Sequence, residues 1–126
     1  MKGTLLLAHG SRRKETEQTM AEVCGEVRSL TGGNVTFAFM EFSENNIEAG
    51  LERLRADGAR EVCVVPYFLF DGVHIHEDIP AELAAYQAGH PEMRVRFGRT
   101  LGADRRLAEI VADRIREAQA QGQEAS

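Results

Sequence analysis

The sequence predicts an α/β fold in which a four-stranded parallel sheet is flanked by helices. Short apolar runs alternate four times with amphipathic stretches, which is the pattern of strands and helices in turn. The first run, residues 4–8, is apolar without polar alternation, as a strand buried on both faces should be. The length of 126 residues suits one compact domain. We expect that domain over residues 1–118, with a polar C-terminal tail over 119–126.

The first two strand and helix pairs can be placed from apolar spacing and glycines. After the strand at 4–8, a helix with apolar residues every three or four positions is expected to end at the glycine pair 32–33. The second strand, 35–41, precedes a helix for which Ser43 is the predicted N-cap and Gly58 the end.

The third and fourth pairs enclose the longest loop of the chain. The third strand, 61–65, runs into Pro66, and the loop at 67–77 leads to a helix that begins at about 78 or 80 and ends at 87. The fourth strand, 93–97, precedes a last helix. Its apolar residues are Leu107, Ile110, Val111 and Ile115. Right-handed crossovers place the first strand centrally, with ligands expected beyond the carboxyl ends of the strands.

Composition excludes several classes of function. The formal net charge is −5 and the Lys and Arg residues are scattered, which disfavours a nucleic-acid partner. No apolar run approaches the ~20 residues of a membrane span, and the start does not resemble a signal peptide, so we expect a cytoplasmic protein. Cys24 and Cys63 lack a CxxC spacing and are interpreted as buried free thiols without a chemical role. Arg12, Arg13 and Lys14 could still attract an anionic small molecule.

Four side chains with metal-binding or proton-transfer chemistry follow the predicted strands. His9 follows the first strand, Glu41 ends the second, and His74 and His76 lie in the loop after the third. Because parallel strands end at one edge of the sheet, these groups are expected to converge there. Histidine and carboxylate ligands suit cobalt, nickel, iron or zinc, and a site with few protein ligands leaves positions open for exchange.

Each candidate also has a structural interpretation. His9 could be a hydrogen-bonded loop residue, although the adjacent Gly10 would let a ligand approach, and Glu41 could favour the start of the next helix. His74 and His76 would point the same way in an extended segment and diverge in a helix. His90 is interpreted as a turn residue at the opposite end of the sheet, and Asp78 is predicted to be a helix cap.

Two motifs resemble those of a known family. Residues 5–12, read as LLLAHGSR, and residues 66–74, read as PYFLFDGVH and followed by Asp-Ile-Pro at 78–80, resemble the short CbiX type of class II chelatase. This family comprises the sirohydrochlorin cobaltochelatases and their ferrochelatase relatives. The match covers nearly the whole chain. It implies insertion of cobalt, with iron or nickel as alternatives, into sirohydrochlorin on the route to cobalamin or sirohaem.

The resemblance also implies roles for individual residues. His9 and His74 would bind the metal, His76 would be a neighbour, and Glu41 would act with the histidines in catalysis. The metal would be a substrate, with no permanent cofactor. A single-copy chain would correspond to half of the longer members and would work as a homodimer. The residues expected to bind the tetrapyrrole are Gly10, Ser11, Arg12, Tyr67, Phe68, Leu69 and Gly72.

Other interpretations of the same residues stay open. The aromatic run 67–70 could pack in the core below the loop instead of contacting the ring. A histidine phosphatase would carry arginine before the first histidine, where this chain has Ala8. A metal carrier or tetrapyrrole-binding protein could use the same histidines without turnover.

Overall fold

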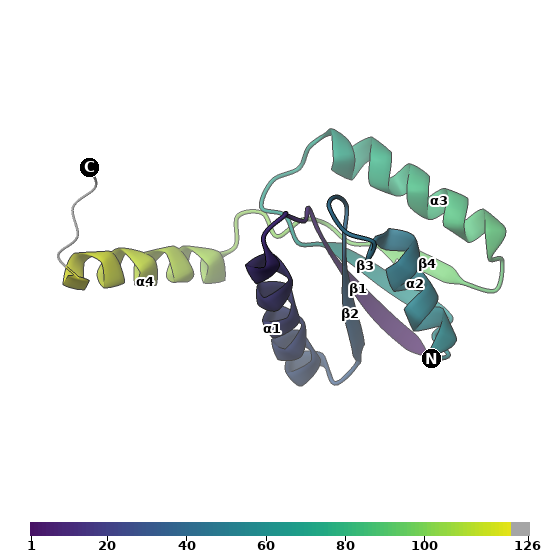
Figure 1. Ribbon diagram of the computed structural model, residues 1–126, viewed down its shortest axis with the longest axis horizontal. Coiled ribbons are helices and arrows are strands. Elements are labelled where there is room, and N and C mark those ends of the chain that lie inside the picture. The colour runs from purple at the N-terminus through teal and green to yellow at the C-terminus, as the bar shows by residue number, and fades with distance from the viewer. Residues whose placement is uncertain (122–126) are drawn as a thin grey trace.

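The sheet order confirms the predicted α/β architecture. The computed structural model, shown in Figure 1, describes residues 1–121, with the side chain of His74 outside the described part. Its strands are β1 (Lys2–Ala8), β2 (Asn34–Phe39), β3 (Glu61–Pro66) and β4 (Arg94–Phe97). All pair in parallel in the order β2-β1-β3-β4, so β1 is central as predicted. The helices are α1 (Lys14–Thr31), α2 (Ile47–Ala56), α3 (Ile79–Gly89) and α4 (Arg105–Gln121).

The two faces of the sheet have different cores. Leu5 and Leu7 of β1 point to the face covered by α2 and α3, where the larger core also includes Val62 and Val64 of β3. Leu6 of β1 points to the opposite face, packs with residues of α1 and β2, and is buried there. The unbroken apolar run of β1 is thus explained by burial on both faces.

Helix α2 begins at an asparagine rather than at the predicted serine. Asn46 is the N-cap, and its Oδ1 accepts a hydrogen bond from the Ala49 backbone N–H at 2.9 Å. Ser43 Oγ instead accepts the Asn45 N–H at 3.0 Å and stabilises the preceding turn. The prediction of Ser43 as the cap was therefore wrong, because a cap must stand immediately before the first helical residue.

We expect Asn46→Ala to lower the free energy of unfolding by ~1 kcal/mol, since it leaves one N-terminal N–H of α2 without its acceptor. Urea unfolding followed by circular dichroism measures the difference. Asn46→Asp retains an acceptor and is the matched control. Equal destabilisation by the two replacements would show that the cap contributes nothing.

The segment expected to be a loop after β3 is partly helical. One turn of π-helix, η1 (His74–Asp78), leads directly into α3. The backbone of His74 and His76 therefore lies in a helical turn rather than in an extended segment. Asp78 stands at the N-cap position of α3, as predicted, and its side chain makes no capping hydrogen bond there.

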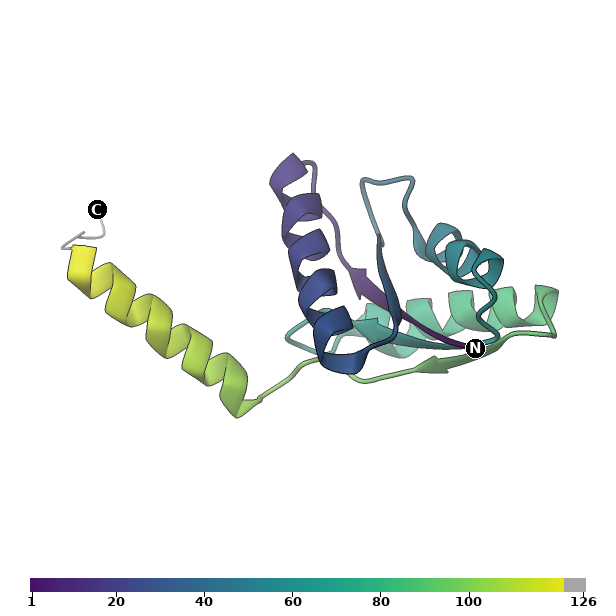
Figure 2. The ribbon, with the colours of Figure 1, turned by 90° about the horizontal axis from the view of Figure 1, so that it is seen from below.

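Helix α4 stands clear of the rest of the molecule. In both Figure 1 and Figure 2 it projects away from the sheet and from the other helices. None of its residues is buried, although it carries the predicted apolar side chains. It continues to Gln121, three residues into the segment 119–126 that we expected to be a tail; residues 122–126 lie outside the described part. No helix among residues 1–121 is long and apolar enough to cross a membrane.

A polar cluster joins α2 to the end of α3, away from the carboxyl edge of the sheet. The Tyr86 hydroxyl donates to Glu52 Oε1 at 2.7 Å, and His90 Nε2 lies 3.2 Å from the same oxygen. The His90 ring stacks on Tyr86, with centroids 4.1 Å apart. This environment gives His90 a structural role, and the hydrogen bond from Tyr86, followed by the charges of Arg55 and His90, lowers the pKa of Glu52.

A lowered pKa in the folded state means that ionised Glu52 stabilises the fold. Its contribution is complete above the pKa of glutamate in the unfolded chain, near ~4.3, and is lost as the pH falls through the folded-state pKa. We therefore expect Glu52→Gln to destabilise the protein at neutral pH and to make no difference in acid. Thermal unfolding of both proteins across this range measures the difference, and a constant gap would contradict this account.

Candidate functional site

The carboxyl ends of β1 and β2 bring two candidate residues together. The Met40 N–H donates to the Ala8 carbonyl and the Glu41 N–H to the His9 carbonyl, both at 2.9 Å. The pairing of the two strands thus continues into the residues that follow them. His9 and Glu41 become neighbours at the edge of the sheet, and both side chains are exposed. This adjacency follows from the backbone pairing of the two loops.

Gly10 makes this close approach possible. Its φ is +96°, a conformation that L side chains rarely adopt, and a Cβ there would lie 2.2 Å from the Glu41 carbonyl oxygen. Any larger residue would push apart the loops that follow β1 and β2. Gly10 therefore acts through its backbone, and its role is to let the loop carrying His9 lie close to the loop carrying Glu41.

The His9 ring rests on the core through an aromatic neighbour. It stacks on the Phe68 ring with centroids 4.2 Å apart and an interplanar angle of 16°. Phe68 is only 7% exposed and belongs to the core under α2 and α3. Phe68, expected to contact the tetrapyrrole, is thus a buried support for His9, in agreement with the core-packing alternative. Stacking against a fixed ring limits the orientations of the imidazole.

The loop after β1 contacts the loop after β2 a second time. The Arg12 guanidinium lies over the Phe42 ring, 4.7 Å from its centroid, within the range of a cation–π interaction. Phe42 has a φ of 60° and is 56% exposed. Ser11 Oγ accepts the Arg13 backbone N–H at 3.0 Å, which orders the turn before α1. The sequence analysis did not include Phe42 among the site residues. The available signal was an aromatic residue directly after Glu41.

An open cavity of about 540 Å³ lies beside His9. It runs from the loop after β1 along the first turns of α1, and Tyr67 lines its opposite side. Tyr67 is 38% exposed. Of the predicted tetrapyrrole contacts, this cavity brings together Gly10, Ser11 and Tyr67 with His9.

The loop after β3 exposes apolar side chains at the same end of the sheet. Leu69, Phe70 and Val73 are 51%, 81% and 65% exposed. Asp71 Oδ1 accepts a hydrogen bond from the buried Thr100 hydroxyl at 2.9 Å, which ties this loop to the segment after β4. His76 Nε2 lies 3.9 Å from Asp71 Oδ2. Asp71 thus orders the loop, a role that the sequence did not indicate.

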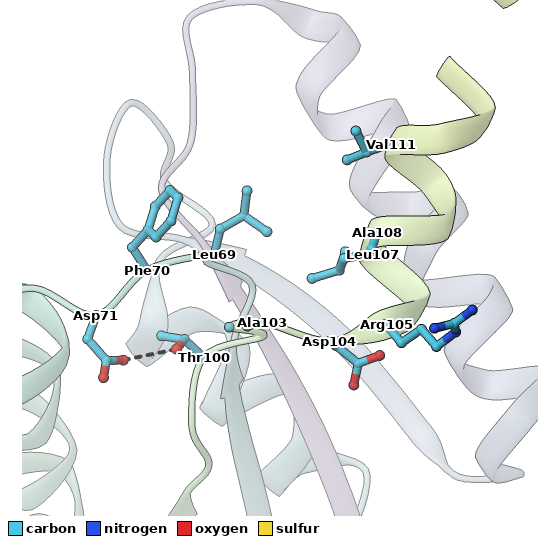
Figure 3. Close-up of a pocket in the computed structure, with 11 residues that line it drawn as sticks. Leu69, Phe70, Asp71, Thr100, Ala103, Asp104, Arg105, Leu107, Ala108 and Val111 are labelled. Atoms are coloured by element: carbon cyan, nitrogen blue, oxygen red, sulfur yellow. Dashed lines mark hydrogen bonds between the residues drawn. The ribbon is translucent and has the colours of Figure 1, made fainter. Parts of the chain in front are cut away.

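A second open cavity, of about 660 Å³, separates this loop from the start of α4. Figure 3 shows Leu69 and Phe70 on one side and Leu107, Ala108 and Val111 of α4 on the other. Leu69 therefore faces a different cavity from Tyr67, and the predicted tetrapyrrole contacts do not all line one pocket. Gly72 lies further along the loop that carries Leu69 and is exposed.

The metal-binding role of the histidines remains a prediction. The side chain of His74 lies outside the described part of the structure. Among the described residues, no three His, Cys, Asp or Glu residues are grouped closely enough to hold a metal ion together. The arrangement of His9 beside Glu41 supplies an imidazole and a carboxylate, which can exchange a metal ion and accept protons.

The family model described as CbiX matches residues 3–118 of this chain. The sirohydrochlorin cobaltochelatase of Sulfurisphaera tokodaii is 29% identical over 117 residues, which cover 93% of both chains. The sirohydrochlorin ferrochelatase of Priestia megaterium is 31% identical over 93% of this chain and 44% of its own. This chain therefore spans about half the length of the Priestia ferrochelatase and nearly the full length of the Sulfurisphaera cobaltochelatase.

The fold agrees with a solved structure of the same kind. The sirohydrochlorin chelatase SirB from Bacillus subtilis subspecies spizizenii, solved in complex with cobalt, aligns with a TM-score of 0.84 and 29% identity. The alignment covers 92% of this chain and 50% of that one. The present fold thus corresponds to one half of the SirB chain.

Proposed function

Because this chain belongs to the CbiX family of class II chelatases, we propose that it catalyses the insertion of a divalent metal ion into sirohydrochlorin. The family match extends over residues 3–118, and relatives with the names of cobaltochelatase and ferrochelatase cover most of the chain. The observation in the structure that best supports the proposal is the placement of an exposed, stacked His9 beside Glu41 at the carboxyl edge of the sheet.

The proposed chemistry exchanges one metal ion for two protons. A divalent ion loses water, enters the macrocycle and replaces the protons of two pyrrole N–H groups. Neutral imidazoles at His9 and His74 would hold the incoming ion, and Glu41 or one of the histidines would accept a proton as the ion moves to the ring. An ion held by few protein ligands keeps positions open for the ring nitrogens.

The tetrapyrrole would lie across the carboxyl edge of the sheet. The exposed rings and side chains of Tyr67, Leu69 and Phe70 offer apolar surface there. Arg12, held over Phe42, and the backbone amides at the start of α1 could contact peripheral carboxylates of the ring. Gly10, Ser11 and Gly72 would line the approach to the metal.

Cobalt is the metal we propose first, with iron and nickel as alternatives. Histidine and carboxylate ligands accept all three ions, and availability often decides which is used. Two of the relatives named above illustrate the choice, since one is a cobaltochelatase and the other a ferrochelatase. A route to cobalamin would use cobalt, and a route to sirohaem would use iron.

We also propose that two copies act together as a homodimer. The chain corresponds to half of the Priestia relative and to half of the SirB chain. Two copies together would provide both halves of the fold that those longer chains contain in one chain. The alternative function, a metal-binding or tetrapyrrole-binding protein without turnover, would use the same residues.

An anaerobic absorbance assay tests the proposed reaction. Purified protein is mixed with sirohydrochlorin and with cobalt(II), iron(II) or nickel(II) in separate reactions, each beside a control without protein. We expect faster spectral conversion to the metallated ring than in the control, and the ratio of rates identifies the preferred ion. Folded protein that accelerates none of the three would refute the proposed activity and favour the binding function.

A further inference from the structure

Half of one face of the sheet is left without a covering helix. In β3, Val62, Val64 and Pro66 are buried beneath α2 and α3, whereas Cys63 and Val65 on the other face are only partly buried. On that face α1 packs mainly against β2 and leaves β3 and β4 open. Parallel sheets are normally covered on both faces, so this open half requires a partner.

The open half lies beside α1 and has one cavity at each end, and we call this strip of the sheet the trench. Its lower end is a cavity of about 330 Å³ lined by Lys2, Thr4, Cys63 and Arg96, among others. Its upper end is the cavity of about 540 Å³ between the first turns of α1 and Tyr67. From Glu61 to Tyr67 the trench is ~20 Å long, by the rise of a strand.

Helix α4 has the complementary properties. Its apolar side chains recur at helical spacing and remain exposed, with Ile110, Val111 and Ile115 at 47%, 58% and 52%. Its 17 residues span ~25 Å, which matches the length of the trench. If α4 runs antiparallel to β3, its negative C-terminal end lies over the lower cavity, where Lys2 and Arg96 outnumber Glu61.

The short connection before α4 favours packing of this helix in the trench of another copy over packing in the trench of its own chain. The Leu101 N–H donates to the Phe68 carbonyl at 2.9 Å, and Thr100 is bonded to Asp71, so the chain is fixed to its domain as far as Leu101. Asp104 already belongs to the start of α4, since its carboxylate accepts the Arg106 N–H at 2.9 Å. Only Gly102 and Ala103 separate the two rigid parts, and short connections favour exchange between copies.

We propose that two copies of this chain exchange their α4 helices, each helix filling the trench beside α1 of the other copy. The apolar strip of α4 would cover Cys63 and Val65, and the first turn of α4 would form a wall of the cavity below His9. The contact is reciprocal, as in a dimer with twofold symmetry. This inference rests on the homodimer of the proposed function and gives its contact surface.

Chemical crosslinking through Cys63 tests the exchange. Ile115 lies ~15 Å from the start of α4, and Cys63 lies ~13 Å from Tyr67, so the two residues should face each other. A short bismaleimide, whose reach is less than the ~10 Å width of a helix, is added to the full chain carrying Ile115→Cys. Arg116→Cys, about 100° round α4 from residue 115 and outside its apolar strip, is the matched control.

We expect the Ile115→Cys protein to give covalent dimers on a denaturing gel. The yield of dimer from the Arg116→Cys protein should be at least ~10-fold lower. A monomer-sized product with Cys63 linked to residue 115 would show that α4 covers its own trench and would overturn the exchange. So would equal yields from the two variants. The assay reports the position of α4 and not metal insertion, so it can fail or succeed independently of the proposed activity.

Alkylation of Cys63 in the unmodified chain gives a second test that needs no substitution. Cys24 is fully buried, which leaves Cys63 as the thiol that reports on the trench. If α4 is exchanged, dilution should separate the copies and raise the alkylation rate of Cys63 by ~10-fold or more. A rate that does not change with protein concentration, while size measurements show the dimer separating, would overturn the proposal.

Discussion

Replacing His9 with alanine is expected to lower the rate of metal insertion by ~100-fold or more. The substitution removes the imidazole that stacks on Phe68 and stands beside Glu41. His74→Ala is expected to have an effect of similar size if both histidines hold the ion. Initial rates at saturating tetrapyrrole, with the metal concentration varied, separate weaker metal binding from slower transfer.

His76→Ala is the matched control for both histidine variants. His76 is exposed and stands 3.9 Å from Asp71, at the same end of the molecule. The family resemblance makes it a neighbour of the metal site rather than a ligand, so we expect near-normal turnover. A His9→Ala protein as active as His76→Ala would remove His9 from the mechanism.

Gly10→Ala is expected to lower the free energy of unfolding by ~3 kcal/mol and to reduce activity in the protein that still folds. The new Cβ would meet the Glu41 carbonyl oxygen, and the φ of +96° would be strained for alanine. Both effects separate the loop carrying His9 from the loop carrying Glu41. Urea unfolding and the absorbance assay measure the two losses.

Gly25→Ala supplies the comparison. Gly25 lies within α1, and a Cβ there would meet no atom within 4 Å. Alanine favours the helix, so this variant should be as stable as the unmodified protein or more stable by up to ~1 kcal/mol. If Gly10→Ala were equally well tolerated, the close approach of the two loops could not be a requirement of the fold.

The central place of β1 and the edge that carries the candidate residues could be predicted from the sequence. The unbroken apolar run in β1 requires burial on both faces, which only a central strand achieves. His9 and Glu41 directly follow their strands, so parallel pairing alone brings them together. The end of α1 was equally clear, because Gly32 adopts the left-handed conformation common after helices.

Other features depend on contacts that local patterns do not specify. The aromatic run after Pro66 does not reveal that Phe68 is buried while Tyr67 and Leu69 are exposed, since that depends on how the loop packs over the core. The single turn of η1 is too short to produce a periodic signal. The apolar face of α4 was visible in the sequence, but periodicity does not identify the surface that covers it.

The most direct test of the central claim is a count of product molecules per chain. The protein is incubated anaerobically with cobalt(II) and a large excess of sirohydrochlorin, and the metallated ring is quantified by absorbance after subtraction of the reaction without protein. An enzyme that uses His9 for metal insertion should form many product molecules per chain, and the His9→Ala protein should fall to the uncatalysed rate. Product that stops at one molecule per chain, or that is unaffected by the substitution, would contradict the account.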